Sequence, residues 1–259
     1  MNADPMAGRW LSGTRKPQAR ARVIAFPHAG GTCGAYRQWQ AWADPGLDVR
    51  AVRYPGRAGR FTEPPYTRCE PLARDIAACL QMVADLPLVL FGHSMGALVA
   101  FEVAVELERT YGIRPARLIV SGAPAPHLPS VTPGMRSDAS DAELVAAMRA
   151  MGGSSEDVLA DPDLVGLLLP AMRADLAIGE AYRPRTRTRI AAPLTAMSGT
   201  DDGDATADAM QEWQAYTEGT FRRRSFSGAH FYLHDEQARQ VFDCVREQAC
   251  ERPRSERIQ

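Results

Sequence analysis

The chain has 259 residues, with 30 basic and 31 acidic side chains and a formal net charge of −1 at pH 7. That balance provides no attraction to nucleic acid or to an anionic membrane surface. Apolar residues make up 45% of the chain, which is enough for a globular core. The length is compatible with one large α/β domain, so we expect a single domain over residues 1–259.

The five cysteines are odd in number and fit neither a C-x-x-C motif nor a metal-ligand spacing. The first 20 residues lack an apolar segment of signal-peptide length. The longest apolar run is interrupted at residues 92–94, well short of a membrane span. We therefore expect reduced thiols, no metal site, no membrane association and a cytoplasmic location.

The first half of the chain alternates short apolar runs with helical patterns. Residues 1–20 are expected to be a loose arm, held to the body by Trp10 and Leu11. We expect strands at residues 22–26, 48–53, 86–91 and 116–120, and helices at residues 36–42, at residues 70–84 and from the end of a glycine-rich turn to residue 109. This alternation predicts a mostly parallel sheet with right-handed crossovers.

The alternation stops at residue 130. Residues 130–180 contain no good strand, and we expect helices at residues 141–151, 154–159 and 161–180. Strands at residues 193–197 and 220–226 and helices at residues 205–216 and 235–250 complete the chain. A helical insertion of this kind predicts a lid over a site, and the alternative is a helical hairpin that only decorates the sheet.

Four apolar residues are candidates for the wall of a substrate chamber. Leu164, Leu168 and Met172 share one stripe of the expected helix over residues 161–180, so we expect them to face the substrate. Phe231, near the end of the chain, is a further candidate.

Residues 92–96 read Gly-His-Ser-Met-Gly, which is a G-x-S-x-G pattern between an apolar strand and a helix. In that context the pattern predicts a nucleophile elbow, a sharp turn that holds the Ser94 hydroxyl at the end of the sheet above a helix N-terminus. The alternative is a glycine-rich turn with an incidental serine. We expect Ser94 to be a nucleophile.

A serine hydroxyl needs a positioned base. Of five histidines, His230 follows the last strand in a glycine-containing loop, downstream of an acid, so we expect it to be the general base. His93 adjoins the serine and is expected to pack beneath the elbow. Asp201 and Asp202 both follow the strand at residues 193–197, and only one can reach the base. We favour Asp202, with Asp201 as the alternative.

Two backbone N–H groups would stabilise the oxyanion. One is that of Met95, directly after the nucleophile, and the other is that of Ala29, in the loop after the first strand. Glycines at positions 30 and 31 let this loop approach a ligand closely. The alternative is a tight turn selected for steric reasons alone.

Taken together, these segments resemble the type II thioesterases, the free-standing editing hydrolases of polyketide and nonribosomal peptide synthesis, which have the α/β-hydrolase fold. The similarity extends from Trp10 to the last helix and is carried by residues 26–31, 54–57, 92–97, 121–126, 144–153, 173–176, 182 and 228–233. Family members also place the acid third after a glycine, as Gly199 and Asp202 do here. Residues 203–206 depart from the family, in which a proline and an apolar residue are frequent.

The resemblance implies hydrolysis of acyl groups from the phosphopantetheine thiol of acyl or peptidyl carrier proteins, either to edit or to release a product. The route would be an ester on Ser94, cleaved by water that His230 activates. It implies no cofactor of the enzyme's own, carrier-protein domains and small acyl thioesters as partners, and a monomer. The alternatives are a carboxylesterase acting on small oxygen esters, an acyltransferase, and a catalytically silent carrier-binding module, against which the intact triad argues.

Overall fold

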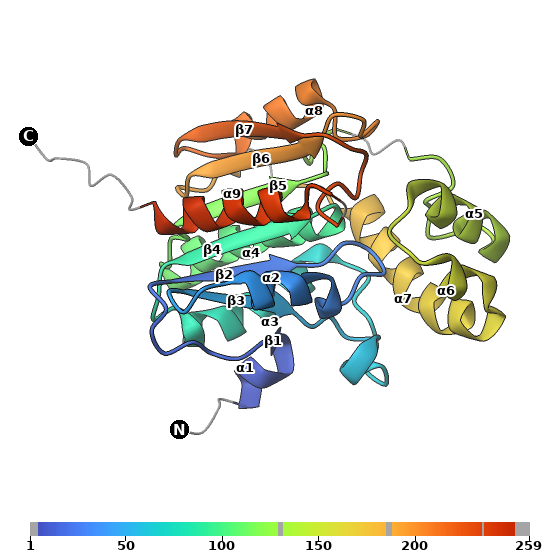
Figure 1. The fold of residues 1–259 in the computed structure, drawn as a ribbon, viewed down its shortest axis with the longest axis horizontal. Helices are drawn as coiled ribbons and strands as arrows, with labels where there is room; N and C mark the ends of the chain where they lie inside the picture. Colours follow the sequence, from blue (N-terminus) through green and yellow to red (C-terminus); the bar gives the residue numbers. More distant parts are fainter. Residues whose placement is uncertain (1–4, 129–131, 185–187, 235, 252–259) are drawn as a thin grey trace, which may run out of the picture.

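The computed structural model describes residues 5–128, 132–184, 188–234 and 236–251. Its centre is a seven-stranded sheet in the order β1-β3-β2-β4-β5-β6-β7 (Figure 1). The strands are β1 (Leu11–Ser12), β2 (Ala21–Phe26), β3 (Leu47–Val52), β4 (Leu88–His93), β5 (Arg117–Ser121), β6 (Leu194–Gly199) and β7 (Phe221–Phe226). All pairs except β1–β3 are parallel, which confirms the predicted mostly parallel sheet.

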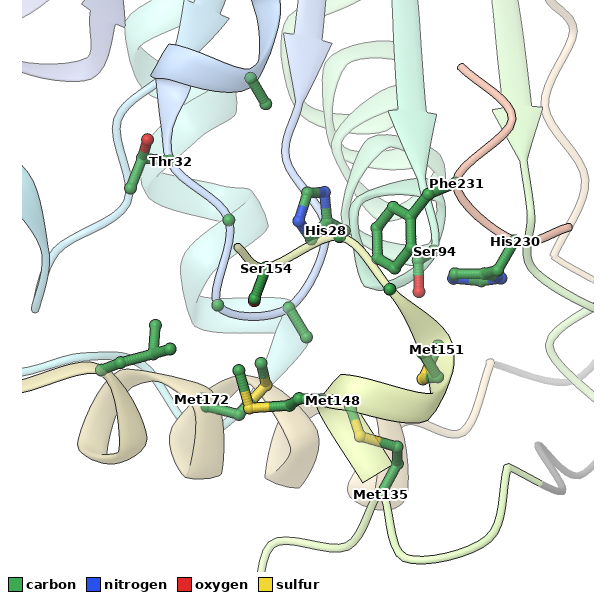
Figure 2. Close-up of a pocket in the computed structure, with 17 residues that line it drawn as sticks. His28, Thr32, Ser94, Met135, Met148, Met151, Ser154, Met172, His230 and Phe231 are labelled. Carbon is green, nitrogen blue, oxygen red and sulfur yellow. The ribbon is translucent and has the colours of Figure 1, made fainter. Parts of the chain in front are cut away.

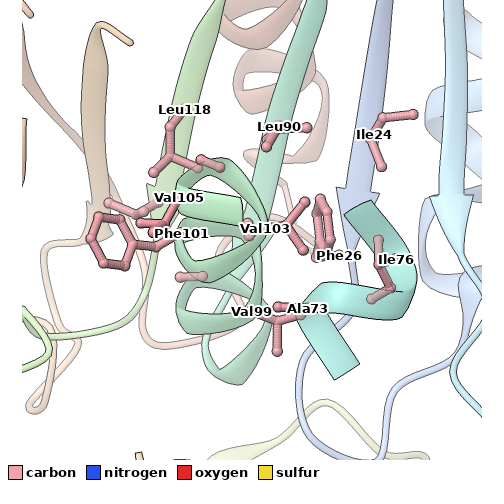
Figure 3. Close-up of a cluster of buried hydrophobic side chains, with 14 of the residues drawn as sticks. Ile24, Phe26, Ala73, Ile76, Leu90, Val99, Phe101, Val103, Val105 and Leu118 are labelled. Carbon is pink, nitrogen blue, oxygen red and sulfur yellow. The ribbon is translucent and has the colours of Figure 1, made fainter. Parts of the chain in front are cut away.

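Helices cover both faces of this sheet (Figure 1). Helices α3 (Cys69–Leu80) and α4 (Met95–Tyr111) pack on one face, and α2 (Arg37–Trp42) and α9 (Ala238–Cys250) pack on the other. Because successive strand residues point to opposite faces, Ile24 and Leu90 join the first layer (Figure 3), whereas Val23 and Val89 join the second. Burial on both sides explains why the central strands are continuous apolar runs.

The remaining elements are short or lie at one end of the sheet. They are α1 (Pro5–Trp10), η1 (Cys33–Tyr36), η2 (Ala58–Arg60), η3 (Gln81–Val83), α5 (Asp141–Met151), α6 (Glu156–Ala160), α7 (Pro162–Ala181), α8 (Ala207–Gln211) and η4 (Glu212–Tyr216). Within the described ranges, no helix has the length and apolar character needed to cross a membrane.

The expectation of a loose N-terminal arm was wrong for residues 5–12. They form α1 and β1, and Leu11 pairs with Val52 of β3. The Trp10 carbonyl accepts a hydrogen bond from the Arg53 N–H at 2.8 Å, and the Arg60 guanidinium lies 4.2 Å from the Trp10 ring centroid. A two-residue strand has no periodicity to detect, and its partners come from later in the chain. Residues 1–4 lie outside the described part.

Helices α5 and α6 lie beyond one end of the sheet, and α7 runs from them back towards α4, where Ile178 joins the main core (Figure 1). We call α5, α6 and α7 the helical segment. Ser140 and Glu143 form a reciprocal capping box that begins α5, and Asp161 caps α7 by accepting two backbone N–H bonds. The segment has a small apolar core of its own, made of Leu144, Met148, Leu159, Leu169 and Met172. Residues 130 and 131, where the expected lid begins, lie outside the described residues.

The order of the strands creates a crevice at one place in the sheet. Strand β3 lies on one side of β2, and β4 lies on the other. The connection from β2 to β3 therefore runs towards one edge of the sheet, and the connection from β3 to β4 runs towards the other, which makes the gap between β2 and β4 a switch point. Phe26 and Gly92 are paired at the carboxyl ends of these strands. Ligands of open α/β sheets bind outside the carboxyl ends of the strands at such a switch point. The loop after β2 and the serine turn after β4 meet there.

Candidate active site

Ser94 occupies a sharp turn between β4 and α4. Its backbone has φ 55° and ψ −127°, a conformation that a non-glycine residue rarely adopts. A Cβ on Gly92 would lie 2.0 Å from the Gly96 carbonyl oxygen, and a Cβ on Gly96 would lie 2.2 Å from the Phe26 carbonyl oxygen. The two glycines are therefore required for the turn to close. The half-buried Ser94 side chain faces a cavity (Figure 2).

The structure brings Asp202, and not Asp201, to His230. Asp202 Oδ2 lies 2.9 Å from His230 Nδ1, and Oδ1 accepts the N–H groups of Asp204 and Ala205, each at 3.1 Å. Burial by itself raises the pKa of Asp202. The hydrogen bond and charge of His230, with the two backbone N–H groups, outweigh burial and hold this pKa below its usual value. Asp201 is exposed.

The second ring nitrogen of His230 makes no contact with the acid. His230 Nε2 is buried and has no hydrogen-bond partner among the described residues. Figure 2 shows the imidazole beside Ser94 at the edge of the cavity. Hydrogen bonds between a nucleophile and its base are often long in structures without a ligand and tighten when substrate binds. Ser94 as the hydrogen-bond partner of His230 Nε2 therefore stays a prediction.

Beneath this pair lies His93, which is fully buried as predicted. Its Nδ1 is 2.9 Å from Ser121 Oγ, which in turn is 2.6 Å from the Tyr232 hydroxyl. The His93 ring centroid is 4.9 Å from that of His230. Burial, reinforced by the neighbouring histidines, lowers the pKa of His93 well below its usual value, so it supports the site as a neutral ring. The roles of Ser121 and Tyr232 were not predicted from the sequence.

The loop after β2 forms a tight turn over residues 28–31. The Gly31 N–H donates to the His28 carbonyl at 2.9 Å, and Gly30 has φ +72°, as the third residue of a type II turn requires. Ala29 lines the cavity, and Met95 is the first residue of α4. The roles of the Ala29 and Met95 N–H groups as oxyanion donors stay predictions.

His28 is held neutral in this turn. Its Nδ1 is buried without a hydrogen-bond partner among the described residues, and its ring centroid is 4.9 Å from that of Phe231. Burial, followed by electrostatic interactions with nearby His234, His230 and Arg57, lowers the pKa of His28 to about 3.

A buried ion pair behind the turn was not assigned a role from the sequence. Asp175 of α7 accepts from Arg57 at both oxygens, with Oδ2–Nη1 at 2.5 Å and Oδ1–Nη2 at 2.6 Å. The Gly30 N–H donates to Asp175 Oδ2 at 2.8 Å, and Arg57 Nη1 donates to the Gly31 carbonyl at 3.2 Å. Both residues fall in segments that carried the family resemblance, and that was the only signal for them.

The cavity beside Ser94 has a volume of about 290 Å³. Four methionines of the helical segment and the loop before it, Met135, Met148, Met151 and Met172, line it (Figure 2). Of the predicted chamber residues, Leu168, Met172 and Phe231 lie in its wall. In the described part of the chain, no cluster of three or more His, Cys, Asp or Glu side chains could hold a metal ion.

The prediction that Leu164 faces the substrate chamber differs from what the structure shows. Leu164 is 42% exposed and does not line the cavity, although Leu168 and Met172 on the same stripe do. Leu164 lies in the first turn of α7, next to the N-cap Asp161, beyond the edge of the cavity. Helical periodicity predicts which side of a helix a residue faces, but it does not predict where along the helix a cavity ends.

A mostly parallel sheet flanked by helices, with a serine elbow after β4, an acid after β6 and a histidine after β7, defines an α/β-hydrolase. The family model described as "Thioesterase domain" matches residues 21–249. The chain belongs to the thioesterase family.

Three similar proteins extend this result. Linear gramicidin dehydrogenase LgrE of Brevibacillus parabrevis is 36% identical over 233 residues, which cover 88% of each chain. Thioesterase PikA5 of Streptomyces venezuelae is 35% identical over 238 residues, covering 91% of this chain and 83% of PikA5. The structure of BorB, the type II thioesterase from the borrelidin biosynthetic cluster, aligns with a TM-score of 0.85 and 37% identity over 96% of this chain and 99% of BorB.

These similarities identify the chain as a hydrolase of the type II thioesterase kind, acting on thioesters. One relative is named a dehydrogenase, but the loop after β2 in this chain lacks the G-x-G-x-x-G pattern that binds dinucleotides.

Proposed function

We propose that this thioesterase removes acyl groups from the phosphopantetheine thiol of carrier proteins in polyketide or nonribosomal peptide synthesis, with Ser94 as nucleophile. The observation that carries the proposal is the Asp202–His230 hydrogen bond beside Ser94, at the mouth of an apolar cavity. The similarity to PikA5 and BorB supports the choice of pathway.

In the first half of the reaction, His230 Nε2 accepts the Ser94 proton while Oγ attacks the thioester carbonyl carbon. Asp202 holds the imidazole in the tautomer whose Nε2 is free, and it stabilises the imidazolium that forms. The N–H groups of Ala29 and Met95 donate to the oxyanion. When the tetrahedral intermediate collapses, the C–S bond breaks and the thiol leaves with the proton held by His230.

In the second half, water replaces the departed thiol. His230 accepts a proton from this water as its oxygen attacks the acyl carbon of the Ser94 ester. Collapse breaks the ester bond, returns the proton to Ser94 Oγ and releases a carboxylic acid. Because a thiol has a pKa of about 8.5, it leaves far more readily than an amine, and a single histidine is sufficient for both transfers.

The cavity indicates the class of acyl group. Its volume of about 290 Å³ is just below the range for small-molecule sites, about 300–1,000 Å³. Methionine side chains are flexible and polarisable, and they adapt to apolar groups of different shape. A methionine-lined chamber therefore suits short or medium apolar acyl groups of varied structure, as an editing hydrolase would meet them.

The test is to incubate acyl-loaded carrier proteins with the wild type and with Ser94→Ala, and to measure acyl loss by intact-protein mass spectrometry. We expect wild-type protein to convert acyl-carrier to free holo-carrier, and Ser94→Ala to leave the acyl group in place while keeping the native circular dichroism spectrum. A fluorophosphonate should label the wild type at Ser94. Labelling at another serine, or unchanged turnover by Ser94→Ala, would contradict the proposed nucleophile.

The same assay separates the carrier thioesterase from a carboxylesterase. Matched butyryl and hexanoyl groups are offered as carrier thioesters and as p-nitrophenyl esters. The proposal expects higher kcat/KM for the carrier thioester of each pair. A consistent preference for the free oxygen esters would instead indicate a carboxylesterase.

A further inference from the structure

We propose that the buried Arg57–Asp175 ion pair is a positioning device that sets the oxyanion turn from the helical segment. Asp175 belongs to α7, whereas Arg57 and the turn at residues 28–31 belong to the body of the domain. The inference rests on the proposed serine mechanism, because it assigns these residues to the geometry of one of its oxyanion donors. On this proposal, the oxyanion hole is ordered only when α7 is packed against the turn at residues 28–31.

The first support is that the pair ties down the backbone directly after Ala29. The Gly30 N–H donates to Asp175, the Gly31 carbonyl accepts from Arg57, and the Gly31 N–H closes the turn onto His28. The three polar backbone groups that fix the turn thus have partners, and two of these partners are the members of the ion pair. Ala29, the predicted donor, is the residue that these bonds hold in place.

The second support is the choice of turn type. In a type II turn the peptide between the second and third residues has the opposite orientation to that in a type I turn. Here that peptide joins Ala29 to Gly30, and its N–H points to the Asp175 carboxylate. If the peptide flipped, it would direct a carbonyl oxygen towards a carboxylate. The negative charge of Asp175 therefore selects one orientation of the Ala29–Gly30 peptide.

The third support is burial and close packing. Asp175 is 3% exposed and Arg57 is 8% exposed, so each charge depends on the other because water does not solvate it. Gly30 approaches α7 so closely that a Cβ there would lie 2.5 Å from Met172 Cε. The turn and α7 are in direct contact at the same place where the charges meet, so a displacement of α7 removes both kinds of support at once.

The experiment compares Asp175→Asn and the double variant Arg57→Met/Asp175→Leu with wild type. Asp175→Asn keeps an oxygen acceptor but leaves Arg57 buried without a counter-charge, so it can lose stability. The double variant removes both charges, and apolar replacements of a buried pair often retain or raise stability. The matched control is Tyr182→Phe, which deletes a buried hydrogen bond of 2.9 Å between the end of α7 and Glu102, away from the turn.

Two readouts are measured for each variant. The first is kcat and KM with hexanoyl-S-N-acetylcysteamine, and the second is the rate at which a fluorophosphonate labels Ser94. We expect both Asp175 variants to lose on the order of 10²-fold in kcat and in labelling rate, the effect of an impaired oxyanion donor, with KM changed only a few-fold. Tyr182→Phe should keep both rates.

The inference is overturned if the double variant folds and regains wild-type kcat and labelling rate, because the pair would then serve stability alone. It is also overturned if KM rises while kcat is unchanged, which would assign the pair to substrate binding. Failure of the proposed function is distinguishable, because wild-type protein would then leave the acyl-loaded carrier proteins of the first assay intact. The labelling rate, which needs no particular substrate, would still report on the turn.

Discussion

Gly199 lies against the backbone of Gly228, so that a Cβ on Gly199 would be 2.3 Å from the Gly228 carbonyl oxygen. Gly199 ends β6, and Gly228 is in the loop after β7. The Asp201 N–H donates to that same carbonyl at 3.0 Å. This backbone contact holds the loop that carries Asp202 at the distance from which its side chain reaches His230.

We therefore predict that Gly199→Ala lowers kcat without unfolding the protein. The added methyl group must push the two loops apart, and a misplacement of about 1 Å can cost about 10²-fold in rate. Gly203→Ala is the matched control, since a Cβ at Gly203 in the same loop would meet no atom within 4 Å. Thioester hydrolysis and thermal unfolding of both variants check the prediction. Equal rates in the two would show that the contact is not needed.

The two adjacent aspartates should differ sharply. If Asp202 orients His230, Asp202→Asn should reduce kcat by about 10⁴-fold, as loss of the correct imidazole tautomer does in serine hydrolases. Asp201 is exposed, so Asp201→Asn should stay within a few-fold of wild type. Steady-state kinetics with one acyl thioester are sufficient. A larger loss for Asp201→Asn would transfer the role of the acid to that residue.

Chain-length preference should depend on the cavity wall and not on the outer surface of α7. Leu168 lines the cavity, so Leu168→Trp should shorten the preferred acyl chain while sparing acetyl thioesters. Each buried methylene contributes about 0.8 kcal/mol, so two carbons correspond to about tenfold in kcat/KM. Leu164→Trp, on the same helix but 42% exposed, is the control and should leave the profile unchanged. If both profiles matched wild type, the wall would lie elsewhere.

Acid should destabilise the fold through its buried neutral histidines. The unfolded His28 binds a proton near pH 6.5, whereas the folded one does so only at about pH 3. Between these values the unfolded state holds more protons, so the free energy of unfolding falls as the pH falls, by about 1.4 kcal/mol per pH unit. His28→Gln should remove this contribution to the slope between about pH 6.5 and pH 4.5 and leave the free energy of unfolding nearly independent of His28 above pH 6.5, as measured by urea unfolding. Parallel curves for the two proteins would refute it.

Patterns of local origin were readable in the sequence. The apolar runs of β2 and β4 are buried on both faces, and the glycines at positions 92 and 96 fit only a sharp turn, so the strands and the elbow follow from residue type and spacing. N-cap residues such as Ser140 and Asp161 indicate where the helices of the insertion begin. From these local signals came the fold class and the candidates Ser94 and His230.

Other features depend on contacts between distant residues. Strand β1 forms because Leu11 pairs with Val52. The part of α7 that lines the cavity includes Leu168 and Met172 but not Leu164, which lies near the start of the helix. The partnership of Arg57 with Asp175 spans 118 residues, and neither side chain carries a local sign of it. A one-dimensional pattern records which face a residue prefers. Only the folded chain decides which of two neighbouring carboxylates meets the histidine and which buried charges meet each other, because those distances depend on how whole elements pack.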